Sequence, residues 1–240
     1  MIYLYILYIE MSIGRIDPPM SPRAYRMDKR QAARDLTRAR VLDAVRQLLA
    51  DDSTRDLSME AVARRADVSR LTIYYQFGSR AGLLEALFDY LATRGNMQRM
   101  ADVFQAPTPS RALDNMVSTF VGFWSADPSV MRRLRAMAVL DGEIDQGVRA
   151  RDERRVHIAQ EILKRATQTK RLDAHQVQAA DVLSMLTSFE TYDALARSGQ
   201  TDDQIVATLR SLAQSVLATL VPSPARPSRS DKARRQKPTP

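Results

Sequence analysis

Residues 58–84 read SMEAVARRADVSRLTIYYQFGSRAGLL and contain two short helical patterns that lie almost end to end. Ser58 can cap a helix over 59–66, and Ser69 can cap a second helix over 70–75. Only Asp67 and Val68 separate the two. Such a pair matches a helix-turn-helix, whose second helix enters the major groove of DNA while the first crosses the backbone.

This geometry predicts which side chains face inward and which face outward. A small core that fixes the crossing angle is expected from Val62, Ala63, Ala66, Val68 and Ile73. Four residues of the second helix then point outward and are candidates to contact base edges: Arg70, Leu71, Thr72 and Tyr75. An apolar side chain such as Leu71 can contact a thymine methyl group.

The same segment resembles the TetR family of transcriptional regulators. The matching residues, at the spacing of the family, are Ala63-Arg-Arg-Ala66, Val68-Ser69, Thr72-Ile73-Tyr74, Phe77, Ser79-Arg80 and Leu83-Leu84. With the helix upstream, the resemblance covers about residues 36–92. It implies a three-helix DNA-binding domain, a fourth helix that links it to a divergent ligand-binding and dimerisation domain, and release of DNA by a small molecule.

The resemblance also suggests which residues contact phosphates. Tyr74 and Arg80 stand where the family has phosphate-contacting side chains, and Ser69 and Gln76 complete the expected set. Three positions depart from the family pattern: Asp67 replaces a usual glycine, Leu71 a usually small residue, and Gln76 a frequent histidine. Because of Leu71, the operator sequence cannot be transferred from the family.

The composition of the 240 residues supports an all-α fold with a polyanionic partner. Glycine is scarce, with eight residues, and good helix formers are abundant. The net charge of +8 is uneven, since residues 28–80 hold eleven basic and eight acidic side chains, 81–221 sixteen and seventeen, and 222–240 six and one. The absence of cysteine excludes disulfides, thiolate zinc sites, iron–sulfur clusters and a cysteine nucleophile, and we expect no metal or cofactor.

Periodicity predicts about nine helices and four regions. Residues 1–35 are expected to be an extension and linker, disordered or upstream of the true start. Within them the apolar run 1–9 either precedes the natural start, at Met11, Met20 or Met27, or forms an arm too short to span a membrane. Residues 36–80 form the helix-turn-helix domain, and 81–221 the body. Residues 222–240 form a basic disordered tail. Helices are expected near 36–50, 79–104 and 173–197, among others.

Aromatic and methionine residues of the body, most of them simply core, suit an adaptable apolar pocket. The pocket residues proposed for a small apolar or amphipathic effector are Phe104, Met116, Phe120, Trp124, Met137 and Phe189. The helices within 173–221 are apolar on two sides, which predicts a homodimer interface. Its expected members are Val182, Met185, Phe189, Ile205, Leu209, Leu212 and Val216.

These features together favour an all-α, dimeric, cytoplasmic regulator that binds palindromic double-stranded DNA and no membrane. A helical enzyme is disfavoured because no nucleophile–base pair or metal cluster can be assembled from the sequence. A DNA-binding architectural protein with a solid, non-sensing body stays open as an alternative. Salt-dependent duplex binding separates the regulator from the enzyme, and ligand-induced release separates it from the architectural protein.

Overall fold

The computed structural model describes residues 22–51 and 57–220, and within these ranges every regular element is a helix. The expected all-α fold is therefore confirmed. The α-helices are α2 (Pro22–Ala50), α3 (Met59–Ala66), α4 (Arg70–Phe77), α5 (Arg80–Arg94), α6 (Met100–Gln105), α7 (Pro109–Ala126), α8 (Pro128–Ala138), α9 (Gly142–Thr167), α10 (Ala174–Leu186), α11 (Phe189–Arg197) and α12 (Asp202–Leu220). A 3-10 helix, η1 (Met97–Arg99), precedes α6. None of the helices in these ranges is both long and apolar enough to cross a bilayer.

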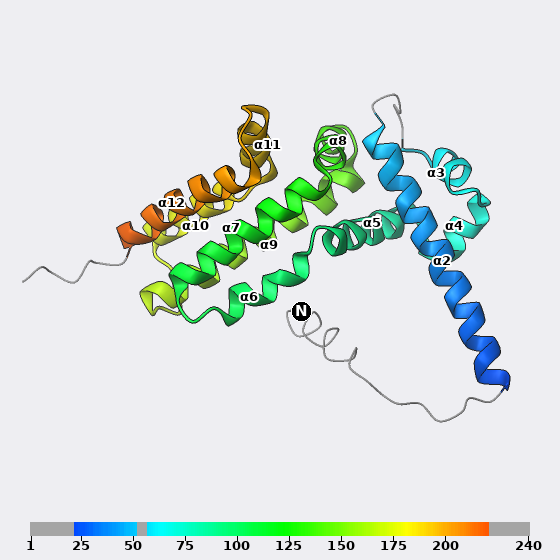
Figure 1. Ribbon diagram of the computed structural model, residues 1–240, viewed down its shortest axis with the longest axis horizontal. Coiled ribbons are helices and arrows are strands. Elements are labelled where there is room, and N and C mark those ends of the chain that lie inside the picture. The colour runs from blue at the N-terminus through cyan, green and yellow to red at the C-terminus, as the bar shows by residue number, and fades with distance from the viewer. Residues whose placement is uncertain (1–21, 52–56, 221–240) are drawn as a thin grey trace, which may run out of the picture.

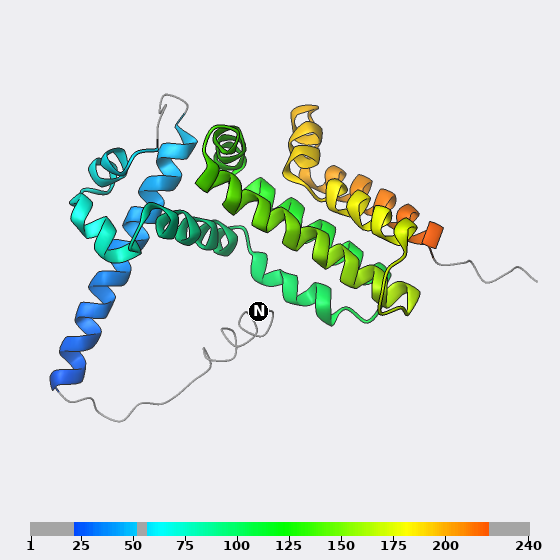
Figure 2. The ribbon, with the colours of Figure 1, turned by 180° about the vertical axis from the view of Figure 1, so that it is seen from behind.

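The helices form an elongated molecule with two ends (Figure 1). Helices α2, α3 and α4 make one end, and α5 leads from them into a bundle of long helices. In that bundle α9 packs on α7 and α10, and α12 packs on α7 and α10. The view from behind shows α10 and α12 at the end farthest from α3 and α4 (Figure 2). The regions predicted to bind DNA and to form the dimer thus lie at opposite ends of the molecule.

The helix-turn-helix core is as predicted. Val62, Ala63, Ala66 and Ile73 are buried, and Val68 packs against them at intermediate exposure. Val41 and Val45 of α2 and Leu87 of α5 join the same core. Apolar contacts from three directions therefore fix the angle between α3 and α4.

Helix α2 begins at Pro22, well before the expected start near residue 36. The expected linker over 1–35 is therefore wrong for residues 22–35, whereas residues 1–21 lie outside the described part. Residues 23–40 include six arginines and four alanines and contain neither Gly nor Pro, so helix propensity is high. Their sequence has no apolar stripe, and no side chain from 31 to 40 is buried, so apolar periodicity did not reveal this part of the helix. The expected tail over 222–240 also lies outside the described residues.

Two predicted long helices are each broken in the structure. The helix expected over 79–104 ends at Arg94, because Gly95 packs against Phe123 so closely that a Cβ would lie 2.4 Å from its ring, and Asn96 is left-handed with φ 55°. The helix expected over 173–197 stops at Leu186, and Ser188 caps the next one. Buried donors from other helices satisfy the carbonyls at this second break: Trp124 Nε1 donates to Thr187 at 3.0 Å and Arg155 Nε donates to Ser184 at 3.1 Å.

The turn between α3 and α4 depends on Asp67, which adopts the left-handed conformation with φ 50° and ψ 53°. An aspartate carries a steric cost there and places a negative charge at a helix C-terminus. We expect Asp67→Gly to raise the free energy of unfolding by about 0.5–1 kcal/mol, and Asp67→Ala not to. Urea denaturation followed by circular dichroism measures both. Equal stability of the two variants would show that the backbone conformation carries no cost.

Candidate nucleic-acid interface

Helix α4 is a short helix with both ends fixed and little of it buried. The Ser69 hydroxyl accepts a hydrogen bond from the Thr72 amide at 3.0 Å, and the Gly78 amide donates to the Tyr74 carbonyl at 2.8 Å. Ile73 is the one residue of α4 that is fully buried. The remaining surface of the helix is therefore free to meet a partner.

The four residues predicted to contact bases all lie on this accessible surface. Leu71 is 78% exposed and Tyr75 is 71% exposed. Arg70 is exposed and forms an ion pair with Glu60 of α3. The Thr72 hydroxyl lies 2.8 Å from the Ser69 hydroxyl, so Thr72 also belongs to the cap of α4. A leucine and a tyrosine that are both largely exposed on one short helix are an unusual combination that suits a binding surface.

The residues predicted to contact phosphates differ from one another in exposure and in position. Ser69 is exposed at the start of α4, and Tyr74 is 39% exposed on its side. Gln76 is partly buried, and its carbonyl accepts a hydrogen bond from Arg38 of α2 at 3.2 Å. Arg80 does not belong to α4; it is the first residue of α5.

The Arg80 guanidinium joins the DNA-reading end to the body. It donates to both carboxylate oxygens of Asp141, one of them at 3.3 Å, and forms an ion pair with Glu143. The hydrogen bonds between the two side chains hold the pKa of the Asp141 carboxyl below its usual range and raise the pKa of Arg80, although partial burial acts in the opposite direction on both groups. Asp141 also caps α9, since its Oδ1 accepts from the Glu143 and Ile144 amides. The start of α5 and the start of α9 are therefore held by one charged cluster.

A second set of contacts continues this junction along α5 and α9. Arg151 donates to Glu85 at 3.1 Å, and its guanidinium carbon lies 3.9 Å from the centre of the Phe88 ring. Gly147 allows the close approach, because a Cβ there would lie 2.4 Å from the same ring. No local sequence pattern predicts these pairs, because their members are 59 to 66 residues apart.

The predicted effector pocket corresponds in part to a buried aromatic cluster. Trp124 stacks on Phe120 with ring centres 6.0 Å apart and meets the Phe189 edge at 5.6 Å. Met116 is fully buried on the same helix as Phe120, and Met137 is partly buried. The prediction is wrong for Phe104, which is 47% exposed on α6, because that helix buries Met100 and Val103 instead.

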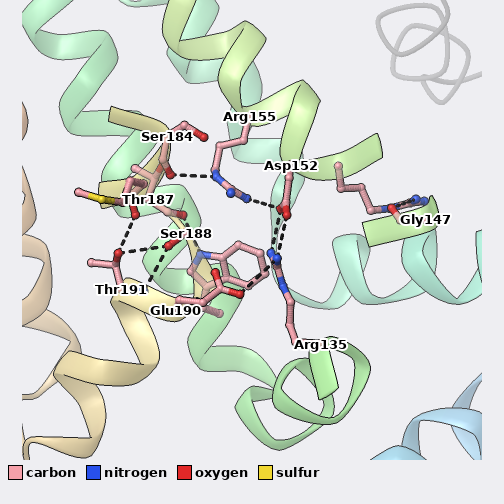
Figure 3. Close-up of polar contacts among 12 residues, drawn as sticks. Arg135, Gly147, Asp152, Arg155, Ser184, Thr187, Ser188, Glu190 and Thr191 are labelled. Atoms are coloured by element: carbon pink, nitrogen blue, oxygen red, sulfur yellow. Dashed lines mark hydrogen bonds and ion pairs between the residues drawn. The ribbon is translucent and has the colours of Figure 1, made fainter. Parts of the chain in front are cut away.

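A charged network that the sequence analysis missed borders this cluster (Figure 3). The Arg155 guanidinium, only 6% exposed, donates to Asp152 at 2.8 Å and lies 5.9 Å from the Phe120 ring centre. Asp152 also receives two hydrogen bonds from Arg135, at 2.7 and 2.8 Å. The signal was available in the sequence, since Arg155 falls at helical spacing within the buried stripe of α9 that includes Ile144, Ala159 and Ile162.

The far end of the molecule carries an exposed apolar surface on α10 and α12. Met185 is 57% exposed, Leu212 47% and Val182 39%, and Val216 is partly exposed. Val182 and Val216 also line an open groove of about 380 Å³ between the two helices. We call Val182, Met185, Leu212 and Val216 the outer apolar face.

Three residues predicted for the dimer interface are corrected by their burial. Phe189, Ile205 and Leu209 are at most 3% exposed within the single chain, where they pack in its own core. They are therefore unavailable to a second subunit. On α12, Leu212 and Val216 share one apolar stripe with Ile205 and Leu209 but are less buried, a difference that apolar periodicity alone does not show.

Comparison with known proteins places these features in a family. Residues 41–87, which span the helix-turn-helix and its flanking helices, match the family described as bacterial regulatory proteins, tetR family. The HTH-type transcriptional regulator AlkX of Mycobacterium tuberculosis is 36% identical over 118 residues, which cover 46% of this chain and 53% of that regulator. The chain thus matches about half the length of this curated relative.

Solved structures share the architecture over most of the chain. A TetR-like transcriptional regulator from Rhodococcus sp. RHA1 is 21% identical with a TM-score of 0.59, covering 76% of this chain and 96% of that one. AibR, solved with isovaleryl coenzyme A and operator DNA, is 19% identical with a TM-score of 0.55, covering 73% and 97%. The helix-turn-helix geometry agrees with the family match, so residues 41–87 are similar to the tetR family of bacterial regulatory proteins, and the solved structures share the all-α fold of the chain.

Proposed function

We propose that this protein is a homodimeric transcriptional repressor that binds a palindromic operator in the cytoplasm and releases it on binding a small apolar or amphipathic effector. The observation that carries the proposal is the exposure of α4, which buries only Ile73 and presents Leu71 and Tyr75 to the outside. A helix with capped ends and so little buried surface is suited to enter a major groove.

In this proposal the residues of α4 divide into two roles. Arg70, Leu71, Thr72 and Tyr75 contact base edges and determine which sequence is preferred. Ser69, Tyr74, Gln76 and Arg80 contact phosphates and determine register and affinity. Arg70 exchanges its ion pair with Glu60 for the DNA, and Arg80 exchanges part of its contact with Asp141 and Glu143.

The proposed effector site is the region of Met116, Phe120, Trp124, Met137 and Phe189. AibR, which has a similar fold, was solved with both an acyl coenzyme A and operator DNA, so this architecture is compatible with both ligands. Ligand binding at the cluster would reach the DNA-reading end through α9, which carries Arg155 near the cluster and Asp141 at Arg80. The event to test is therefore the release of operator DNA when an effector binds, and we propose no enzymatic activity.

Selection of bound duplexes from a random pool, followed by variants, tests the DNA-reading assignment. Tyr74→Phe is expected to weaken binding to all sequences by about five- to tenfold, because one phosphate hydrogen bond is lost. Arg70→Ala is expected to change the preferred base at one position of each half-site. Arg149→Ala, which removes an exposed arginine of the body, serves as the control and should do neither.

Three outcomes would contradict the proposal at different levels. An unchanged preference profile for Arg70→Ala would refute the role of that residue. Failure of the wild-type protein to enrich any duplex would refute sequence-specific DNA binding itself. A protein that binds DNA but is released by no small molecule would instead be the non-sensing architectural protein.

A further inference from the structure

The N-terminal part of α2 is a helix with no core of its own. Between residues 31 and 40 no side chain is buried, and the first buried residue of α2 is Val41. Figures 1 and 2 show this part of α2 projecting past α4, away from the bundle. Residues 22–40 contain seven arginine or lysine residues and only two aspartates. Packing against the body does not explain a basic helical segment in which no side chain from 31 to 40 is buried.

Arg34 of this segment contacts the most exposed aromatic residue of α4. Its Nη2 donates to the Tyr75 hydroxyl at 2.7 Å, and its guanidinium carbon lies 5.4 Å from the centre of the ring. The Tyr75 hydroxyl that Arg34 contacts is a neutral group. The nearby carboxylate of Asp35 accepts its hydrogen bond from Gln31, at 3.0 Å. The contact orients Tyr75 and leaves a positive charge beside it.

Arg38 repeats this arrangement one turn later. Its guanidinium lies 4.5 Å from the centre of the Phe77 ring, and Nη1 donates to the Gln76 carbonyl at 3.2 Å. Residues four apart lie on the same face of a helix, so Arg34 and Arg38 form a row along α4. This row holds the C-terminal end of α4, where free carbonyls attract a cation.

We propose that the exposed segment of α2 from Gln31 to Arg38 is a second DNA-contacting element, in which Arg34 binds a backbone phosphate flanking the groove entered by α4 and positions Tyr75 there. The inference rests on the proposed function, since α4 must lie in the groove for Arg34 to reach the adjacent backbone. Double-stranded DNA is the partner because the charged row borders the surface that reads it, and a duplex presents phosphates on both sides of its major groove. The operator contact then extends beyond the base pairs read by α4.

The test measures the salt dependence of binding for full-length protein on the selected operator. Arg34→Ala is expected to weaken binding about tenfold and to reduce the slope of log affinity against log salt by about one unit per subunit bound. Arg149→Ala, which removes an exposed arginine of the body, is the control and should leave the slope unchanged. Circular dichroism should show that each variant keeps its helices.

A second measurement locates the contact. On duplexes in which single phosphates are replaced by neutral methylphosphonates, the wild type should lose affinity at a phosphate outside the bases read by α4, and Arg34→Ala should be insensitive to that replacement. Tyr75→Phe removes the hydroxyl that holds Arg34 and should reduce the same sensitivity only in part.

Each outcome decides a separate point. A weaker Arg34→Ala complex with an unchanged slope and an altered base preference would overturn the phosphate contact, because Arg34 would then only position Tyr75. Normal binding by Arg34→Ala would overturn both roles, while Arg70→Ala would still report on the proposed function. If the wild-type protein shows no sequence-specific DNA binding, the proposed function is refuted, and this inference with it.

Discussion

Replacing Met185 and Leu212 together with glutamate is expected to give a folded monomer whose operator affinity is at least about 100-fold lower. Both residues lie on the outer apolar face, where they are 57% and 47% exposed in the single chain. Two charges buried at the centre of an interface oppose association, whereas on a monomer they face water. Separate subunits bind two half-sites without the gain from linkage, which is typically 10² to 10⁴ in affinity.

A matched control uses the most exposed apolar pair of the described residues. Val139 and Leu140, in the turn between α8 and α9, are 83% and 92% exposed, so Val139→Glu with Leu140→Glu makes the same chemical change elsewhere. Sedimentation should show this control to be a dimer and the Met185 and Leu212 variant to be a monomer with native circular dichroism. A wild-type protein that is monomeric at micromolar concentration and still binds its operator fully would refute the interface.

Asp152→Ala is expected to lower the free energy of unfolding by about 2–3 kcal/mol. Asp152 accepts hydrogen bonds from Arg135 and Arg155, and its loss leaves the buried Arg155 guanidinium without a carboxylate. Removing one partner of a fully buried pair typically costs about 3–5 kcal/mol, and the value is lower here because the Asp152 side chain is itself 31% exposed.

The control for this variant is another aspartate of α9 that pairs with an arginine. Asp145 bonds Arg149 at 2.7 Å, but the Arg149 side chain is 73% exposed, so Asp145→Ala should cost no more than about 0.5 kcal/mol. Urea denaturation of both variants gives the comparison. Similar losses in the two would mean that burial of Arg155 contributes nothing to the strength of its pairing.

The helix-turn-helix could be predicted from the sequence because its determinants are local. Ser58 and Ser69 are caps, Val62 and Ile73 are core residues, and only three residues, 67–69, lie between the helices. The extension of α2 could not be predicted in this way, because a polar helix without a core has propensity but no period. Its two contacts with α4, from Arg34 and Arg38, join residues 38 to 41 positions apart.

Other features depend on tertiary structure that no local pattern carries. The break between α10 and α11 is stable because Trp124 and Arg155 arrive from α7 and α9 to satisfy its carbonyls. The neighbouring helices decide how much of the apolar stripe of α12 is covered. The sequence therefore predicted the same role for Leu209 and Leu212, although the structure buries only Leu209. The pairing of Arg80 with Asp141 likewise requires two helix starts to meet.

Helix α9 joins the charged cluster at Arg80 to the network at Arg155 as one continuous 26-residue rod. At 1.5 Å per residue, Asp141 lies about 21 Å along the axis from Arg155. A tilt of only about 5° around Arg155 would therefore move Asp141 by about 2 Å, which is enough to break hydrogen bonds that require donor and acceptor within about 3.5 Å. The length of α9 makes it a lever arm, in which a movement of under 1 Å close to the aromatic cluster is magnified at the Arg80 junction.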